Sequence, residues 1–221
     1  MSSLSLATGP AHGQGRAFLA GGELSGRDYY TYLGTVIPLP GSRLGNGWVQ
    51  RYWVDYYGYS YAGGPGTVDA TAWGAEALLG YQVSDPKRNW AALYLGARYT
   101  DTRLSPDDPG SDVRGGQLGV KAQVEGETWL AERLRANGIA SYTFATSGYW
   151  TRARLLQTLP NNLHVGPEVV FAGNPDYNVW RAGVVVGGFR PLGGYVDLKA
   201  GYSDSSNGSS AYGGVEFYRE Y

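Results

Sequence analysis

Alternation of apolar and polar side chains between Arg114 and Phe144 is the feature that most limits how this chain can fold. From Leu118 to Val124 every second residue is apolar, and the residues between them are polar or glycine. Side chains of an extended chain point alternately to its two faces, so the pattern predicts a strand with one apolar face. We interpret Glu125-Gly126-Glu127 as a turn, after which the alternation predicts a second strand over Thr128–Phe144.

A helix over Thr128–Asn137 is the alternative for this second segment. Leu130 and Leu134 are four residues apart, and Ala, Glu and Arg are good helix formers. The alternation continues past Gly138 and Ile139 to Phe144, however, and this favours the strand.

Composition excludes several classes of protein. The 221 residues include 35 Gly, 19 Tyr and 7 Trp but no Cys, which excludes disulfides and thiolate metal sites. The formal net charge is −1 and the basic residues are scattered, so no nucleic-acid partner is predicted. Apolar runs are far too short for a membrane-spanning helix. Met1–Gly15 shows no secretion signal, and we interpret the chain as a mature form with an added Met.

Turn residues divide the chain after a predicted flexible tail, residues 1–14, into one predicted domain, residues 15–221, with no linker. The predicted strands are Arg16–Leu24, Asp28–Ile37, Gly47–Gly58, Thr67–Tyr81, Asn89–Thr102, Val113–Val124, Thr128–Phe144, Gly148–Thr158, Asn162–Ala172, Tyr177–Gly188, Gly194–Ser203 and Ser209–Tyr221.

The lengths and ends of these strands favour a membrane barrel over a soluble sandwich, whose strands would also alternate. Many reach ten residues or more, the length of a tilted strand that crosses a bilayer. Tyr and Trp gather near strand ends, where interfacial aromatic girdles lie. We therefore predict an all-β fold, a transmembrane antiparallel up-and-down β-barrel of about 12 strands. An even count places both termini on one side.

Charged side chains are predicted to line the lumen. The predicted lumen residues are Arg133, Arg135, Arg152, Arg154, Lys121, Glu168 and Arg181. The four arginines of residues 133–154 would form a basic stripe on adjacent strands and a pathway for a polar solute. The alternative is a structural ion network that fills the interior.

Aromatic residues at inward positions are candidate sugar contacts, because an apolar face flanked by hydrogen-bonding groups suits a pyranose ring. The candidates are Trp53, Tyr57, Tyr94 and Trp150. The alternative is that they fill the lumen or anchor its rim.

Signals for catalysis or metal binding are weak. His164 with Ser141 or Ser147 would suit an acyl hydrolase, but no motif fixes that geometry. The acidic segment Asp107–Asp112 lacks a calcium-loop spacing and is better explained as a solvated turn. The sequence therefore predicts no catalytic residue, no metal site and no cofactor.

Several motifs resemble the outer-membrane cellulose biosynthesis protein family BcsS. They are Pro38-Leu39-Pro40-Gly41-Ser42-Arg43-Leu44-Gly45-Asn46-Gly47-Trp48, the turn Ser105-Pro106-Asp107-Asp108-Pro109-Gly110-Ser111, the strand pair Ser141-Tyr142-Thr143-Phe144 and Tyr149-Trp150-Thr151-Arg152-Ala153-Arg154, and Gly166-Pro167-Glu168. The resemblance implies a role in secretion or surface organisation of cellulose in a Gram-negative bacterium. It carries over no catalytic residues.

Three hypotheses follow. The first is a non-enzymatic barrel of the bacterial outer membrane that assists export or surface assembly of cellulose or another exopolysaccharide. The second is a structural or partner-binding barrel that conducts nothing, and the third is an outer-membrane lipid hydrolase. The expected partners are outer-membrane lipid and lipopolysaccharide, the polysaccharide, and the cellulose-synthesis machinery.

Overall fold

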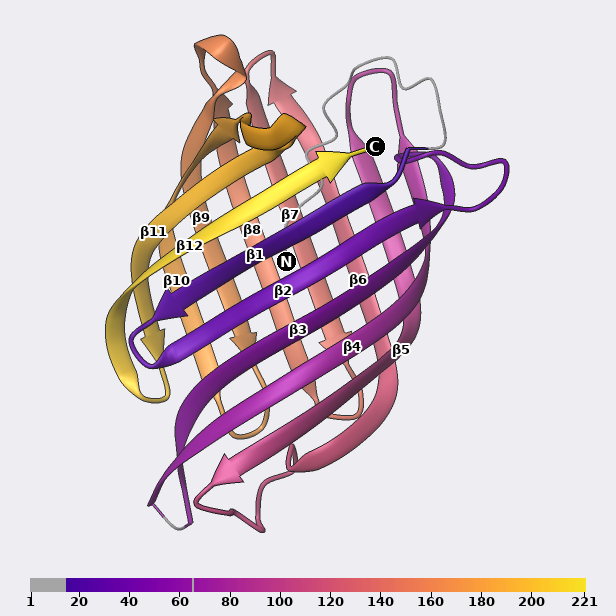
Figure 1. Cartoon of the computed structure of the whole chain (residues 1–221). Coiled ribbons are helices and arrows are strands. Elements are labelled where there is room, and N and C mark those ends of the chain that lie inside the picture. Colours follow the sequence, from indigo (N-terminus) through magenta and orange to yellow (C-terminus); the bar gives the residue numbers. More distant parts are fainter. Residues whose placement is uncertain (1–14, 65) are drawn as a thin grey trace.

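In the computed structural model, which describes residues 15–64 and 66–221, the chain forms a closed antiparallel barrel of twelve strands (Figure 1). Each strand pairs with its sequence neighbours, and β1 pairs with β12 to close the sheet. The strands are β1 (Ala17–Ser25), β2 (Asp28–Pro38), β3 (Gly47–Gly63), β4 (Gly66–Ser84), β5 (Trp90–Ser105), β6 (Gly115–Ala131), β7 (Leu134–Thr143), β8 (Gly148–Thr158), β9 (His164–Gly173), β10 (Asn178–Phe189), β11 (Tyr195–Ser205) and β12 (Gly208–Glu220). Two short 3-10 turns, η1 (Pro160–Asn162) and η2 (Pro191–Gly193), lie between strands. The predicted tail, residues 1–14, lies outside the described residues.

The predicted strand count is confirmed, but the turn between the sixth and seventh strands was misplaced. β6 continues through Glu125–Glu127 to Ala131, and the turn is the pair of residues 132–133. No helix forms over Thr128–Asn137. A two-residue turn alone would shift the inward positions from odd to even numbers, but the register shift between Trp129 and Ala131 in the β6–β7 ladder offsets this change. Odd-numbered residues therefore face inward both before and after the turn, and the alternation is unbroken. The sequence pattern therefore could not locate the turn.

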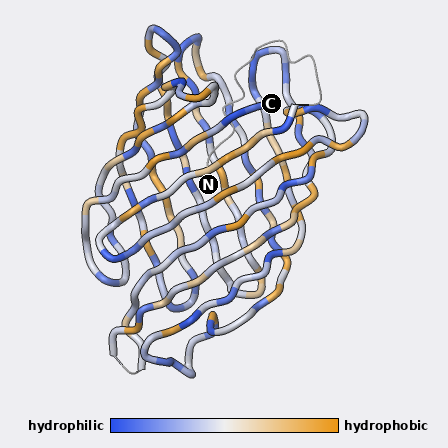
Figure 2. The backbone as a smooth tube through the Cα atoms, in the orientation of Figure 1, coloured by the Kyte–Doolittle hydropathy of each residue, from blue (hydrophilic) through white to orange (hydrophobic). Residues whose placement is uncertain are grey.

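Apolar side chains cover the outside of the barrel. Along the strands the hydropathy colours change repeatedly between hydrophobic and hydrophilic (Figure 2). Leu118 and Leu93 on the outer face are 73% and 63% exposed, whereas the inward Lys121 is 2% exposed. A barrel with an apolar exterior and a polar interior is the arrangement of transmembrane β-barrels. No helix in the described part of the chain is long and apolar enough to cross a membrane.

Aromatic pairs lie on the outer face toward both ends of the strands. The paired rings are Trp48 with Tyr81, Phe18 with Phe217, Tyr29 with Tyr56, Trp73 with Tyr99, Tyr142 with Phe144, and Trp180 with Tyr202. Amphipathic rings at these positions suit the two interfaces of a bilayer.

The two ends of the barrel can be distinguished by the chain ends. The backbone N–H of Arg16, just before β1, donates to the carbonyl of Tyr221, just after β12, at 3.1 Å. We call this the near end and the opposite one the far end. The turns β1–β2, β5–β6, β7–β8, β9–β10 and β11–β12 lie at the far end (Figure 1).

Candidate functional site

A buried layer of ion pairs crosses the middle of the lumen, and one half of it is centred on Glu76 of β4. The carboxylate of Glu76 contacts Arg51 of β3 at 3.5 Å, Arg98 of β5 at 3.2 Å and Lys121 of β6 at 2.5 Å. Arg98 also makes two hydrogen bonds of 2.8 Å to the carboxylate of Asp55. Four adjacent strands thus supply three cations and two carboxylates that pair with one another.

Glycine makes room for this cluster. A Cβ atom at Gly74 would collide with the guanidinium of Arg98 and the carboxylate of Asp55. Gly74 pairs directly with Asp55 across the β3–β4 ladder, so the missing side chain leaves the space in which the two ions meet.

The other half of the layer is centred on Glu216 of β12. Its carboxylate contacts Arg152 at 3.1 Å, and Arg154 and Lys199 at 2.8 Å each. Arg154 also donates to Glu168 of the neighbouring strand β9. These charges come from β8, β9, β11 and β12, so the pairs cross the lumen rather than follow one strand.

Glu23 of β1 extends the second cluster toward the first. Its carboxylate accepts hydrogen bonds from Lys199 and from Arg181 of β10, the latter at 2.6 Å. The side chains of Glu23 and Lys199 are 5% and 1% exposed. The two clusters together form a buried layer of paired charges across the middle of the barrel.

The near half of the lumen is packed with aromatic and apolar side chains. The ring of Trp53 stacks on Tyr32 with 4.6 Å between centroids, and its indole N–H donates to Tyr30 at 3.2 Å. Tyr94 is fully buried and accepts a hydrogen bond from Gln82 at 2.8 Å. The guanidinium of Arg51 lies 4.5 Å from the Trp53 ring and joins this packing to the ion layer.

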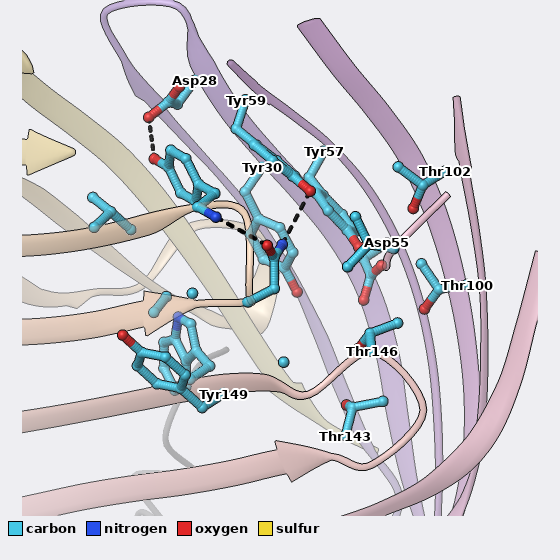
Figure 3. Close-up of a pocket in the computed structure, with 18 of the residues that line it drawn as sticks. Asp28, Tyr30, Asp55, Tyr57, Tyr59, Thr100, Thr102, Thr143, Thr146 and Tyr149 are labelled. Carbon is cyan, nitrogen blue, oxygen red and sulfur yellow. Dashed lines mark hydrogen bonds between the residues drawn. The ribbon is translucent and has the colours of Figure 1, made fainter. Parts of the chain in front are cut away.

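The far half of the lumen holds an open chamber with a volume of about 180 Å³ (Figure 3). Its walls carry the rings of Tyr30, Tyr57 and Trp150, together with hydroxyl groups such as those of Thr100 and Thr102. The charged side chains of Glu23, Asp55, Arg98, Lys121 and Arg181, which belong to the ion layer, also line it. The chamber is therefore closed below by the ion layer.

A tyrosine cap narrows the mouth of the chamber. Tyr59 of β3 packs against Tyr177 at 4.6 Å between ring centroids, and it accepts a hydrogen bond from Asn174 at 3.0 Å. Tyr61 donates to Asp108 at 3.1 Å. The cap consists of Tyr59, Tyr61, Asp108, Asn174 and Tyr177, and it joins the end of β3 to segments 106–114 and 174–177.

Tyr177 also ties the cap to the barrel wall. Its hydroxyl donates to the carboxylate of Asp28 at the start of β2 (Figure 3). Burial, and then this hydrogen bond to Asp28, raise the pKa of the Tyr177 hydroxyl above its ordinary value. Tyr177 therefore remains a neutral hydrogen-bond donor.

Most of the charges predicted for the lumen do lie in the lumen. Lys121, Arg135, Arg152, Arg154, Glu168 and Arg181 are all buried there. The predicted lumen position of Arg133 is wrong, because this residue lies in the exposed turn 132–133. No continuous basic stripe forms among the described residues either: Arg135 lies 3.5 Å from Glu127, and the two arginines of β8 are paired with Glu168 and Glu216.

The four candidate sugar contacts divide into two pairs. Tyr57 and Trp150 line the chamber. Trp53 and Tyr94 are 2% and 0% exposed in the near half, so neither ring has a face available to a sugar. For these two residues the lumen-filling alternative is the correct one.

The proposed hydrolase geometry does not form. Ser141 pairs with Trp150, which pairs with Ala172 near the far end of β9. His164 begins β9 at the near end, eight residues away, or about 26 Å along an extended strand. His164 instead lies 3.2 Å from Asp197.

The acidic segment is a turn, as predicted. Asp107 pairs with Arg114 at 2.7 Å, and Asp108 belongs to the cap. Within residues 15–64 and 66–221, no group of three or more His, Cys, Asp or Glu is placed to hold a metal ion.

The sequence interpretation missed the cap and the chamber residue Tyr30. A usable signal was present, because Tyr57, Tyr59 and Tyr61 recur at every second position and must share the inward face. The contact partners Asn174 and Tyr177 carried no such signal.

Comparison with known proteins agrees with this arrangement. A model of the family described as "Cellulose biosynthesis protein BcsS" matches residues 17–221. The chain belongs to the BcsS family. A search of curated proteins finds no match to this BcsS-family chain.

Solved structures similar to this BcsS-family barrel share its fold at very low sequence identity. A KdgM porin is 10% identical with a TM-score of 0.52, over 91% of this chain and 98% of the porin. A KdgM porin in complex with disordered oligogalacturonate is 11% identical with the same TM-score and coverage. These likenesses establish the fold, a transmembrane barrel of the outer-membrane type.

Proposed function

We propose that this protein is a non-enzymatic barrel of the bacterial outer membrane that assists surface assembly of cellulose or a related exopolysaccharide without conducting the polymer. The observation that carries the proposal is the buried ion layer across the lumen. It favours assembly over passage among the roles that membership of the BcsS family suggests.

The ion layer argues against a pathway through the barrel. Lys121 and Arg152 are each 2% exposed, and Glu168 is 1% exposed. A polymer would have to separate these pairs and leave buried charges without partners, at a cost of about 3–5 kcal/mol for each broken pair. It would also have to displace the packed rings of Trp53 and Tyr94.

The placement of the chamber favours a role at the cell surface. β1 begins and β12 ends at the near end, and we assign this end to the periplasm, the side on which the first and last strands of even-stranded bacterial outer-membrane barrels begin and end. With the near end in the periplasm, the chamber and the segment 106–114 face the exterior. The near rim is then available to the periplasmic part of the synthesis machinery.

Two measurements test this proposal. In planar bilayers we expect no conductance from the purified barrel, and a stable open channel would contradict the sealed lumen. Deletion of the gene is expected to change the amount of secreted cellulose or the organisation of its fibres. Normal cellulose in both respects would reject the role in assembly.

A structural barrel that binds partners only through its rims is the second candidate, because the sealed lumen supports it equally. The deletion experiment distinguishes the two if it is repeated with variants of the chamber. Variants that fold normally but reproduce the deletion phenotype favour the assembly role. Chamber variants with normal cellulose favour the rim-binding barrel.

A further inference from the structure

The far chamber combines the two chemical features that suit a sugar ring. Tyr57 and Trp150 offer aromatic faces at its walls, and Thr100 and Thr102 offer hydroxyl groups. A pyranose has apolar faces formed by its C–H bonds and a rim of hydroxyl groups. Rings and hydroxyls together can therefore satisfy both parts of its surface.

The charges of the chamber leave nothing to attract an ionised ligand. Each cation that lines the described chamber already contacts a carboxylate: Arg98 binds Asp55, Lys121 binds Glu76, and Arg181 binds Glu23. An acidic sugar would have to compete with these buried pairs, which is costly because a carboxylate would lose its partner.

The chamber is also open at one end only. Its floor is the buried ion layer, and its mouth is narrowed by the contact of Tyr59 with Tyr177. A ligand can only enter from the far end and must leave the same way. This shape admits a short oligosaccharide or the end of a chain, and it excludes the middle of a long polymer.

We infer that the far chamber is a binding site for a short uncharged glycan, or for the end of an uncharged glycan chain, held between the rings of Tyr57 and Trp150. This inference rests on the proposed role in polysaccharide assembly and names the ligand class of the same barrel. The ligand enters past the tyrosine cap, where the contact of Tyr59 with Tyr177 narrows the mouth.

The test uses the purified full chain in detergent micelles, with cellotetraose as the neutral probe and tetragalacturonate as the acidic probe, both measured by titration calorimetry. We expect cellotetraose to bind more tightly. Tyr57→Ala and Trp150→Ala are each expected to weaken it about threefold to tenfold, the effect of losing one aromatic contact. The matched controls are Tyr56→Ala and Trp73→Ala, which remove exposed rings from the outer face and leave affinity unchanged.

Several outcomes would overturn the inference. Equal or tighter binding of tetragalacturonate contradicts the uncharged ligand, and cellotetraose binding that survives both chamber variants places the site elsewhere. Circular dichroism of each variant shows whether it has folded, and Tyr57→Phe and Trp150→Phe, which keep an aromatic face, should retain most of the affinity. If neither probe binds while gene deletion alters cellulose, this inference fails and the proposed function stands.

Discussion

Trp53 and Tyr57 lie four residues apart on the inward face of β3, yet they belong to halves of the lumen with opposite properties. Trp53, in the near half, is stacked on Tyr32 and 2% exposed. Tyr57, in the far half, borders open space. The difference arises from the neighbours: Tyr32 covers the ring of Trp53, whereas Tyr57 faces the chamber, which the contact of Tyr59 with Tyr177 narrows at its mouth. One strand thus contributes both to stability and to a candidate binding site.

Of the changes considered, removal of Glu216 from the ion layer between the two halves of the lumen should lower the free energy of unfolding most. Glu216→Ala leaves Arg152, Arg154 and Lys199 without their shared carboxylate, so we expect a loss of about 3–5 kcal/mol in the free energy of unfolding. Urea unfolding in micelles, followed by circular dichroism, measures it. Thr102→Ala in the chamber wall is the control. Equal stability of the two variants would show that the ion layer does not support the fold.

Trp53→Ala tests the packing of the near half. Loss of the buried ring should reduce the free energy of unfolding by about 3 kcal/mol, because the cavity left behind is only partly refilled. Trp73→Ala removes an exposed ring from the outer face and should cost clearly less. We also expect the Trp53→Ala barrel to remain non-conducting, because the ion layer is still in place. A channel in planar bilayers would show that the packing, rather than the ions, seals the lumen.

Tyr177→Phe tests the cap with a smaller change. It removes the hydrogen bond to Asp28, and we expect a loss of about 1–2 kcal/mol. The local effect should be greater than the global one, with faster proteolysis and amide exchange in segments 106–114 and 174–177. Tyr202→Phe on the outer face is the matched control. Unchanged exchange in both segments would mean that Tyr177 does not hold the cap.

The smallest effect is expected at the near rim, in the turn 85–89. The side chain and backbone amide of Asn89 donate to the Asp85 carboxylate, and these hydrogen bonds lower the pKa of Asp85 below its usual 3.8. A carboxyl whose pKa falls on folding stabilises above its unfolded pKa, and the contribution is lost as the pH falls through the folded pKa. Asp85→Asn should therefore be slightly less stable than the wild type at pH 7 and equal to it in strong acid. A difference that persists in acid would assign the effect to something other than this charge.

Much of the fold could be predicted because alternation is a property of the extended backbone alone. Leu118, Val120 and Val124 had to share a face, and Lys121 had to oppose them, whatever the rest of the chain did. The turn at 132–133 escaped prediction because the register shift between Trp129 and Ala131 keeps that alternation intact across the turn. Arg133 was consequently assigned to the lumen although it lies in the turn.

The candidate site could be predicted only in part. Alternation placed Tyr57, Trp150, Trp53 and Tyr94 inside the barrel, but it does not tell which rings are covered. That depends on what lies across the lumen, such as Tyr32 beside Trp53. Single residues in the loops, such as Asn174 and Tyr177, follow no periodic pattern. The cap therefore could not be predicted from the sequence and appears only in the closed barrel.

The sequence by itself determined the strands, the side of the sheet on which each side chain lies and the class of fold, because these follow from local backbone geometry and the hydrophobic effect. Only the tertiary structure decided which charges meet. Glu23 and Lys199 are 176 residues apart in the chain and come together because β1 closes on β12. Closure of the barrel makes such pairs neighbours, and these pairs separate the packed near half of the lumen from the open chamber.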